Sequence, residues 1–310
     1  MPLKCKSKYW ANRGDMMTDI EVHRLSDAIG AEIRGVNLSQ ELDDETVAVL
    51  LDAWHEHQII LFRNQDITNE QQRAFALKFG PLGDRFRPGT QPPELDEYGP
   101  NVMLVSNIRK DGAPIGSLPD GEMMFHSDTP YFEQPAKATI LYAIEITSWG
   151  GHTLFSNSYT AAETLPEDVK RRLDGRKGMQ VYEYGTCIKE KEKYDREKFP
   201  YYAHPIFRKH PITDKSSLYV SELMTEEVLG LPEKESDELL EFLFEHQRNP
   251  ELIYEHAWVP GDLLMWDNRC SVHARTDFPR EERRMLRRLT VEDEYPVLAG
   301  RPPYQETPEM

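Results

Sequence analysis

The chain has 310 residues, of which 39% are hydrophobic and 29% charged, a balance that is typical of a folded protein and too apolar for a disordered one. Its formal net charge of −17 at pH 7 repels nucleic acids and anionic membrane surfaces, and no apolar run approaches the roughly 20 residues needed to span a bilayer. We therefore expect neither a nucleic acid nor a membrane as a partner.

The N-terminal segment and the cysteines bear on the cellular compartment. Residues 1–17 are basic but contain no apolar run, so we expect a flexible tail and not a secretory signal. Cys5, Cys187 and Cys270 form neither a metal-binding spacing nor a disulfide framework. Such sparse cysteines favour a reducing, cytoplasmic location.

The first elements that the pattern predicts are a helix, a buried strand and a second helix. Residues 43–54 place apolar side chains at helical spacing behind two acidic residues, and residues 58–62 include the apolar run of a buried strand. Thr68 then caps a second helix, which ends at the Gly-Pro pair at 80–81.

Three segments are expected to lie outside the regular elements. Residues 84–121 are rich in proline and glycine and contain one strand-like run, at 102–105. Because long irregular segments often cover an active site, we expect 84–121 to form a lid. The charged run at 185–200 is expected to be an exposed insertion, and residues 301–310 a C-terminal tail.

Short strands separated by turn signals make up most of the remaining chain. They are predicted at 123–126, 138–146, 152–155, 178–184, 201–207, 218–220, 252–256, 262–266, 270–273 and 286–292, with a helix at 236–246. Many short strands of this kind predict a sandwich or jelly roll, with the helices covering one face. The sequence thus predicts one mainly β domain over residues 18–300.

Three residues on or beside the predicted strands could bind one metal ion. His126 and Asp128 are two apart, so on a strand they point to the same side of the sheet, and His273 ends another strand. Two histidines and one carboxylate on one face of an iron leave three positions open, as in non-haem Fe(II) oxygenases. A His-x-Asp triplet also occurs by chance, so a structural role stays open. A similar cluster at 55–57 ends a predicted helix, where residues two apart face different directions.

Arginines crowd the segment that follows His273. On a strand, Arg284 and Arg288 face the same way, and two guanidinium groups near a metal ligand make a plausible carboxylate clamp. A solvated basic strand paired with nearby acidic residues is an equally good interpretation. Thr153 either needs no explanation beyond its strand propensity or uses its hydroxyl to hold a carboxylate.

Together these residues resemble the taurine dioxygenase/TfdA-like family of Fe(II)- and 2-oxoglutarate-dependent dioxygenases. The matching segments extend from about Glu21 to Tyr295, in the order and spacing of the family. They are Ile60-Leu-Phe-Arg-Asn-Gln65, Phe79-Gly-Pro-Leu82, Phe125-His-Ser-Asp128, Leu141-Tyr-Ala-Ile-Glu145 with Gly150-Gly-His-Thr-Leu154, His204-Pro-Ile206, Trp258-Val-Pro-Gly-Asp262, Trp266-Asp-Asn268 and the block from His273 to Arg288.

The resemblance implies a fold and a set of site residues. The fold is a double-stranded β-helix, a jelly roll of the clavaminate synthase-like type, with flanking helices. His126, Asp128 and His273 match the iron ligands of the family. Thr153 and Arg284 match the residues that bind the distal carboxylate of 2-oxoglutarate.

The resemblance also bears on the substrate. Arg288 matches a position that contacts the anionic end of the substrate, and Arg85 stands near a second such position. Glu122 replaces an asparagine of the taurine enzyme, so taurine itself is not expected. Asp128 is retained, which argues against halogenation, because related halogenases lack this carboxylate.

These expectations describe an enzyme that uses Fe(II), 2-oxoglutarate and O2. It would oxidise a C–H bond of a small anionic organic substrate and release succinate and CO2. A cupin-like metal-dependent hydrolase or isomerase with the same triad is the alternative, although it would not need a clamp for a distal carboxylate. A catalytically silent β-sandwich binding module is a third interpretation, against which the intact triad and clamp argue. The family also implies a homo-oligomer, a dimer or a tetramer.

Overall fold

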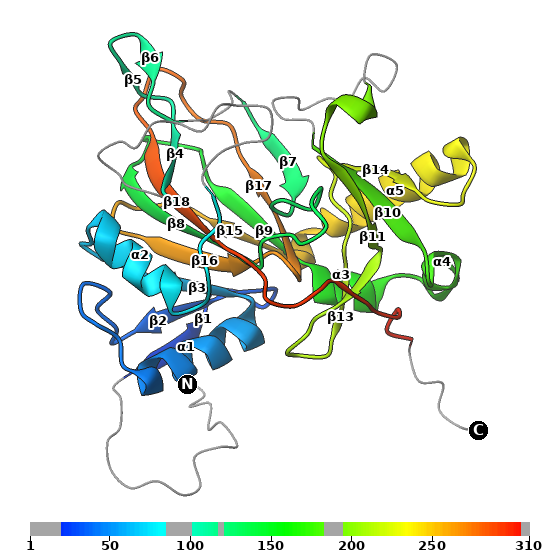
Figure 1. The fold of residues 1–310 in the computed structure, drawn as a ribbon, viewed down its shortest axis with the longest axis horizontal. Helices are drawn as coiled ribbons and strands as arrows, with labels where there is room; N and C mark the ends of the chain where they lie inside the picture. Colours follow the sequence, from blue (N-terminus) through cyan, green and yellow to red (C-terminus); the bar gives the residue numbers. More distant parts are fainter. Residues whose placement is uncertain (1–19, 85–100, 117–120, 183–194, 305–310) are drawn as a thin grey trace, which may run out of the picture.

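The frame of the fold is a seven-stranded sheet, seen in a computed structural model that describes residues 20–84, 101–116, 121–182 and 195–304 (Figure 1). In spatial order its strands are β1 (Glu21–Arg24), β2 (Ala31–Arg34), β3 (Ile59–Phe62), β16 (Leu263–Asp267), β8 (Ala138–Glu145), β18 (Met285–Val291) and β4 (Met103–Ser106). All neighbouring strands are antiparallel except β2 and β3. The sheet therefore joins strands from both ends of the chain.

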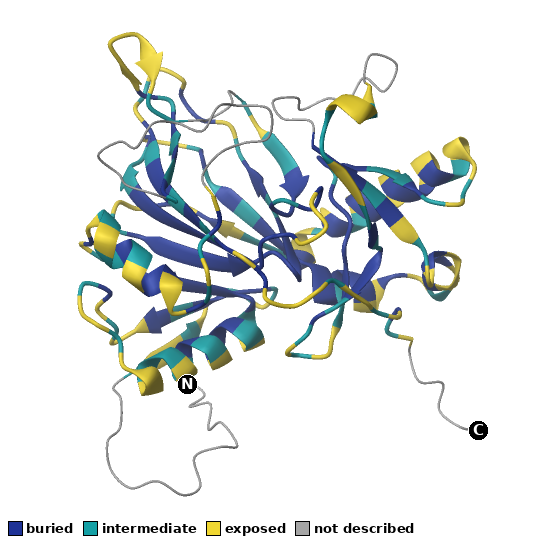
Figure 2. Ribbon diagram, in the orientation of Figure 1, coloured by how far each residue is buried: buried dark blue, intermediate teal, exposed yellow. Residues whose placement is uncertain are grey.

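A four-stranded antiparallel sheet faces the larger one. It contains, in order, β15 (Ile253–His256), β9 (Thr153–Asn157), β17 (Ser271–Arg275) and β7 (Met123–His126). Phe155 of β9 packs against Trp266 of β16 with ring centroids 5.4 Å apart, within an apolar cluster shared by both sheets. The buried strands between the exposed outer surfaces are visible in Figure 2. The molecule is thus mainly β, with an apolar core between two sheets.

Two helices cover the outer face of the seven-stranded sheet. They are α1 (Asp44–His57) and α2 (Asn69–Leu77), and their apolar faces join one core cluster with side chains of β3, β8 and β16. Asp43 caps α1 by accepting from the Thr46 backbone N–H, and Thr68 caps α2 in a capping box with Gln71. Both predicted helices are confirmed.

A second lobe carries the other helices and the shorter strands. Its helices are α3 (Ser158–Thr164), α4 (Glu167–Leu173) and α5 (Glu233–Gln247), with the 3-10 turns Arg196–Lys198 and Pro250–Leu252. Its strands are β10 (Lys177–Val181), β11 (Tyr201–Pro205), β12 (Phe207–Lys209), β13 (Ser216–Leu218), β14 (Thr225–Val228) and β19 (Leu298–Ala299). A hairpin of β5 (Arg109–Lys110) and β6 (Ala113–Pro114) projects from the seven-stranded sheet (Figure 1).

Several predicted boundaries are wrong. The strand predicted at 201–207 is two strands of different sheets, because β11 pairs with β10 and β12 pairs with β13. β17 continues to Arg275, two residues past its predicted end. Arg284 precedes β18 and does not lie on it, and the register shifts by one residue at Met285.

The segments expected to be tails or insertions are described only in part. Residues 1–17, most of the predicted lid and most of 185–200 lie outside the described residues. Within 185–200, Arg196 forms ion pairs with Glu226 and Glu227 of β14. Within 301–310, the Pro303 carbonyl accepts a hydrogen bond from the buried Lys170 of α4 at 2.7 Å.

Candidate metal centre

The pairing of two strands brings the predicted ligands together. His126 ends β7 and lies opposite His273 of β17 in the register, with ring centroids 4.1 Å apart. Asp128 follows two residues after the end of β7. One ligand atom from each of His126, Asp128 and His273 lies within 4.8 Å of the others. The three side chains could therefore hold one ion.

The protonation states of the three residues suit a cation. Burial lowers the pKa of His126 and, together with the neighbouring His126, lowers that of His273 well below its usual value. Burial also acts to raise the pKa of Asp128, but the Arg288 guanidinium, the two imidazoles and the Thr139 hydroxyl outweigh it and lower the pKa to about 2. The site thus offers two neutral imidazoles and one carboxylate.

The ligand atoms fit a metal such as Fe(II). Nδ1 of His126 donates to the Met124 carbonyl at 2.8 Å, which leaves Nε2 as an acceptor. Nδ1 of His273 is buried and has no hydrogen-bond partner among the described residues. Such an atom is costly to bury unless it binds something, and two imidazoles with one carboxylate are the donor set of non-haem iron sites.

Two hydrogen-bond donors hold the Asp128 carboxylate. Oγ1 of Thr139, on β8, donates to Oδ2 at 2.5 Å, and Nη2 of Arg288, on β18, lies 2.7 Å from Oδ1. Arg288 thus reaches the ligand set from the seven-stranded sheet, on the same face of β18 as the buried Leu286. A guanidinium here could meet an anion that enters beside the metal.

Arg284 is a buried cation with unused donors. Its side chain is 2% exposed, and Nη2 donates to the Gly151 carbonyl at 3.0 Å. Nε and Nη1 have no hydrogen-bond partner in the part of the chain that the structure describes. Burial, with a smaller effect from the nearby Arg275, lowers the pKa of Arg284 to about 9. A buried guanidinium in this state calls for an anion.

The glycine pair before β9 makes room for this guanidinium. Gly151 has φ +62°, and a Cβ there would lie 2.9 Å from Nε of Arg284. A Cβ on Gly150, with φ +65°, would lie 2.1 Å from the Asp277 carbonyl oxygen. Both positions therefore require glycine, for conformation and for space.

Thr153 lies in the same region, at the start of β9. It is buried, it pairs with Arg275 of β17 in the register, and its Oγ1 accepts a hydrogen bond from Nε1 of Trp258 at 2.9 Å. The Thr153 hydroxyl proton is therefore available to another acceptor. Thr153, Arg275 and Arg284 together form a donor-rich end of the site.

Four residues of the site were given no role from the sequence: Thr139, Trp258, Asn268 and Arg275. Arg275 could have been found, because it stands two residues after His273 and shares its side of the strand. Trp258 and Asn268 lie in segments that match the family, but their contacts, like that of Thr139, join distant segments and leave no local signal. Arg85 and residues 85–100 and 117–120 of the predicted lid lie outside the described residues.

A second cluster of metal-ligand side chains occurs among the described residues. His210, Asp267 and Cys270 also place one ligand atom each within 4.8 Å of the others, and all three are buried. Arg269 binds both oxygens of Asp267, at 2.9 and 2.6 Å, and Nε2 of His210 donates to Oδ2 at 3.0 Å. The carboxylate is already saturated, so this cluster does not fit a metal.

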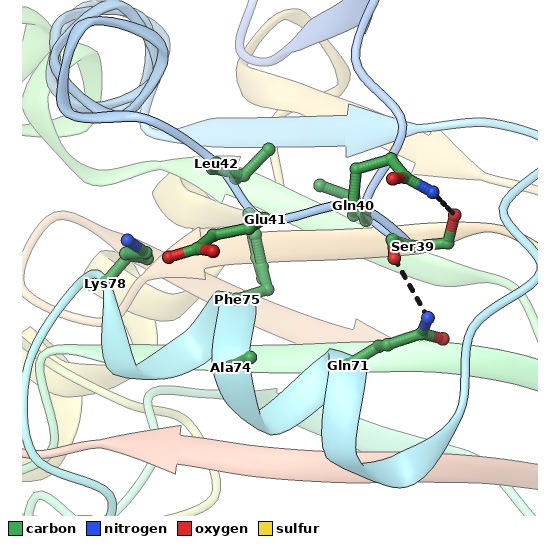
Figure 3. Close-up of a pocket in the computed structure, with 9 residues that line it drawn as sticks. Ser39, Gln40, Glu41, Leu42, Gln71, Ala74, Phe75 and Lys78 are labelled. Carbon is green, nitrogen blue, oxygen red and sulfur yellow. Dashed lines mark hydrogen bonds between the residues drawn. The ribbon is translucent and has the colours of Figure 1, made fainter.

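A surface groove lies away from these clusters. The segment Leu38–Leu42 and one side of α2 line it, and Figure 3 shows the Ser39 carbonyl accepting from Gln71 of that helix. None of the predicted site residues lines it. No helix among the described residues is long and apolar enough to cross a membrane.

Comparison with protein families gives one match over most of the chain. Residues 21–290 match the family described as "Taurine catabolism dioxygenase TauD, TfdA family". The match covers every described residue predicted for the site, from His126 to Arg288.

Curated relatives and solved structures agree with this match. Pentalenolactone F synthase of Streptomyces avermitilis is 32% identical over 84% of this chain and 90% of its own length. The (S)-phenoxypropionate/alpha-ketoglutarate-dioxygenase of Sphingobium herbicidovorans is 30% identical over 87% of this chain and 94% of its own. The crystal structure of AAD-2 in complex with Mn(II) and N-oxalylglycine is similar with a TM-score of 0.73 at 27% identity, over 90% of this chain and 99% of the other.

Proposed function

The chain belongs to the TauD, TfdA family of dioxygenases, and from this premise we propose which of its residues carry the reaction. It is an Fe(II)- and 2-oxoglutarate-dependent dioxygenase. We propose that His126, Asp128 and His273 hold the iron and that Arg284 and Thr153 bind the distal carboxylate of 2-oxoglutarate. When bound, iron with 2-oxoglutarate and O2 supplies the oxidation of a substrate C–H bond, and the cosubstrate leaves as succinate and CO2.

The observation that carries the residue assignment is Arg284. Its guanidinium is buried with two nitrogens that have no partner among the residues described, at the same end of the site as Thr153. A hydrolase or isomerase with the same triad would gain nothing from this buried cation, which costs free energy unless an anion binds it. A carboxylate that accepts from Arg284 and from the Thr153 hydroxyl removes that cost.

The chain's own residues would bind and orient the reactants. The guanidinium of Arg284 and the hydroxyl of Thr153 would fix one end of 2-oxoglutarate, so that its other end reaches the metal. Arg288, at 2.7 Å from Asp128, would meet the anionic group of the substrate close to the metal. The buried walls of the two sheets would exclude water from this space.

The substrate proposed is a small organic anion. The relative from Sphingobium herbicidovorans has phenoxypropionate in its name, which is a carboxylate. The position of Arg288 supports an anion here as well, whether carboxylate, sulfonate, sulfate or phosphonate. Arg85 is proposed as a second contact to the same anion.

Further proposals concern the domain architecture, the oligomeric state and the cellular location. We propose that the two facing sheets form a double-stranded β-helix within one domain at 18–300, and that the parts of 84–121 outside β4 close over the site. The charged segment 185–200 would be an insertion within that domain, and the segments at 1–17 and 301–310 would be its tails. A cytoplasmic dimer or tetramer, without nucleic acid or membrane partners, completes the proposal.

The test is spectroscopic and then chemical. Fe(II) and 2-oxoglutarate, added without oxygen, should produce the weak visible charge-transfer band of a chelated cosubstrate, and N-oxalylglycine should displace it. Admission of O2 with a panel of small organic anions should release succinate in proportion to the substrate consumed. The absence of both the band and succinate would contradict the proposed residue assignment.

A further inference from the structure

The Asp128 carboxylate receives a hydrogen bond whose donor is itself held by a buried chain of side chains. Oγ1 of Thr139 donates to Oδ2 of Asp128 at 2.5 Å, and Nδ2 of Asn268 donates to the same Oγ1 at 3.0 Å. Thr139 and Asn268 are both 0% exposed. No water competes for these bonds, so their geometry is set by the protein alone.

The direction of every bond in this chain follows from donors that cannot accept. Nε1 of Trp266 donates to Oδ1 of Asn268 at 3.0 Å, and the Asp128 backbone N–H donates to the same oxygen at 3.3 Å. Both groups are donors only, so this atom must be the amide oxygen and its partner atom the amide nitrogen. Because that nitrogen donates to Oγ1 of Thr139, the hydroxyl proton is left for Asp128.

We infer that Trp266, Asn268 and Thr139 form a positioning relay that fixes the rotation of the Asp128 carboxylate as a metal ligand; the inference rests on the proposed function. The Thr139 hydroxyl donates to Oδ2 and the Arg288 guanidinium lies 2.7 Å from Oδ1, so each oxygen keeps a lone pair while the carboxylate is held in one orientation. Residues that orient a ligand in this way tune metal affinity without touching the metal.

The same amide also fixes the backbone of the ligand segment. Oδ1 of Asn268 accepts from the Asp128 backbone N–H, while the Asn268 backbone N–H donates to the carbonyl of Lys137, two residues before Thr139, at 2.9 Å. One side chain therefore sets the position of the Asp128 main chain and, through Thr139, the rotation of its carboxylate. Loss of the Thr139 hydroxyl alone should free the rotation and leave the main chain in place.

The experiment compares three variants by their affinity for Mn(II), measured from the EPR signal of the free ion. Thr139→Val keeps the volume and removes the hydroxyl, and it should weaken Mn(II) binding by about 10- to 100-fold. Thr139→Ser restores the hydroxyl and should recover most of the affinity. Thr225→Val is the matched control, because its buried hydroxyl bonds only to Gln180 and Ser221 among the described residues, and it should bind Mn(II) as the unchanged protein does.

A double-mutant cycle tests the relay as a unit. Asn268→Asp replaces the amide donor by a carboxylate oxygen, so Thr139 would turn its proton away from Asp128. The loss of Mn(II) affinity in Asn268→Asp and that in Thr139→Val should therefore not add when combined. Thermal unfolding of each metal-free variant shows whether it folds. If Asn268→Asp does not fold, the comparison of Thr139→Val with Thr139→Ser still tests whether the relay positions Asp128.

Two outcomes separate this inference from the proposed function. If the unchanged protein binds Mn(II) and Thr139→Val binds it equally well, the relay has no positioning role. The same holds if Thr225→Val loses as much affinity as Thr139→Val. If the unchanged protein binds no Mn(II), the metal assignment itself is wrong.

Discussion

Two clusters of metal-ligand side chains, each with a histidine and an aspartate, differ in what their polar atoms already bind. His126, Asp128 and His273 form one, and His210, Asp267 and Cys270 form the other, each with its ligand atoms within 4.8 Å. In the first, Nδ1 of His273 has no hydrogen-bond partner among the described residues. In the second, Arg269 and His210 occupy both oxygens of Asp267.

The difference shows what a metal site needs beyond the right residues. Nδ1 of His210 accepts from the backbone N–H groups of Ile212 and Thr213, so its Nε2 carries the proton. Burial, and to a smaller extent Asp267, raises the pKa of Cys270 well above its usual value, which keeps it a thiol. The second cluster therefore offers neither a thiolate nor a free imidazole or carboxylate lone pair, and its hydrogen bonds instead hold together the turn between β16 and β17.

The largest expected effect separates the two clusters by metal content. His273→Ala should lose metal binding and reduce turnover to background, because only two ligands remain. Cys270→Ala should retain one metal per chain. Metal analysis of both proteins after Fe(II) loading checks this, and loss of metal in Cys270→Ala would contradict the comparison.

The second effect concerns stability. Arg269→Met should lower the free energy of unfolding by about 3–5 kcal/mol, because it leaves Asp267 and Asp293 buried without this cation. Arg172→Met, which breaks an exposed pair with Glu235, should cost less than about 1 kcal/mol. Urea unfolding measures both. Equal stability losses in the two variants would show that the buried ion pairs of Arg269 stabilise the protein no more than an exposed ion pair does.

The third effect tests whether the unpartnered donors of Arg284 are available to bind 2-oxoglutarate. Arg284→Met should weaken 2-oxoglutarate binding by about 2–3 kcal/mol, since a buried charged hydrogen bond is lost. The same change should leave the metal-free, cosubstrate-free protein as stable as before or more so, because a buried cation is removed.

The exposed neighbour supplies the control for this prediction. Arg283 pairs with Glu145 at the surface, so Arg283→Met should leave 2-oxoglutarate binding unchanged. Calorimetric titration gives the affinities, and thermal unfolding gives the stabilities. Strong destabilisation of Arg284→Met without ligand would show that the protein itself satisfies this arginine.

The smallest effect is a dependence of stability on pH. Arg269 and His210 outweigh the effect of burial and hold the pKa of Asp267 well below its usual value. The unfolded chain therefore binds the proton first, and the stability from Asp267 is present above about pH 4 and lost as the pH falls below it. Asp267→Asn should reduce the slope of stability against pH there by at most ~1.4 kcal/mol per pH unit. An unchanged slope in urea unfolding would count against a charged Asp267.

The sequence predicted the elements whose pattern is local. The first helix was expected at 43–54 and spans Asp44–His57, and the strand at 123–126 is β7. The seven-residue helices α3 and α4 were missed, since two turns are too short for a clear periodicity. The pairing of β11 and β12 with different sheets depends on distant partners, so no local pattern could show it.

For the site, too, the sequence predicted the residues that carry a motif and not those that act through distant contacts. The order of motifs named His126, Asp128 and His273, and the structure places their ligand atoms together. Thr139 was not named, and Asn268 was named within a matching segment but given no role, because their contact joins positions 129 residues apart. Strand propensity alone explains a threonine in a buried strand, so only the three-dimensional contact with Asp128 reveals the role of Thr139.

The pairing of β7 with β17 has a consequence for how this protein folds. Asp128 and Asn268, which meet beside that pairing, are 140 residues apart in the chain. Contacts of such separation form late, since the entropy of closing the loop must be overcome before they contribute. The nascent chain therefore cannot assemble the ligand set until β17 has been synthesised and has paired with β7. Iron binding would then depend on this long-range pairing and not on the local folding of either strand.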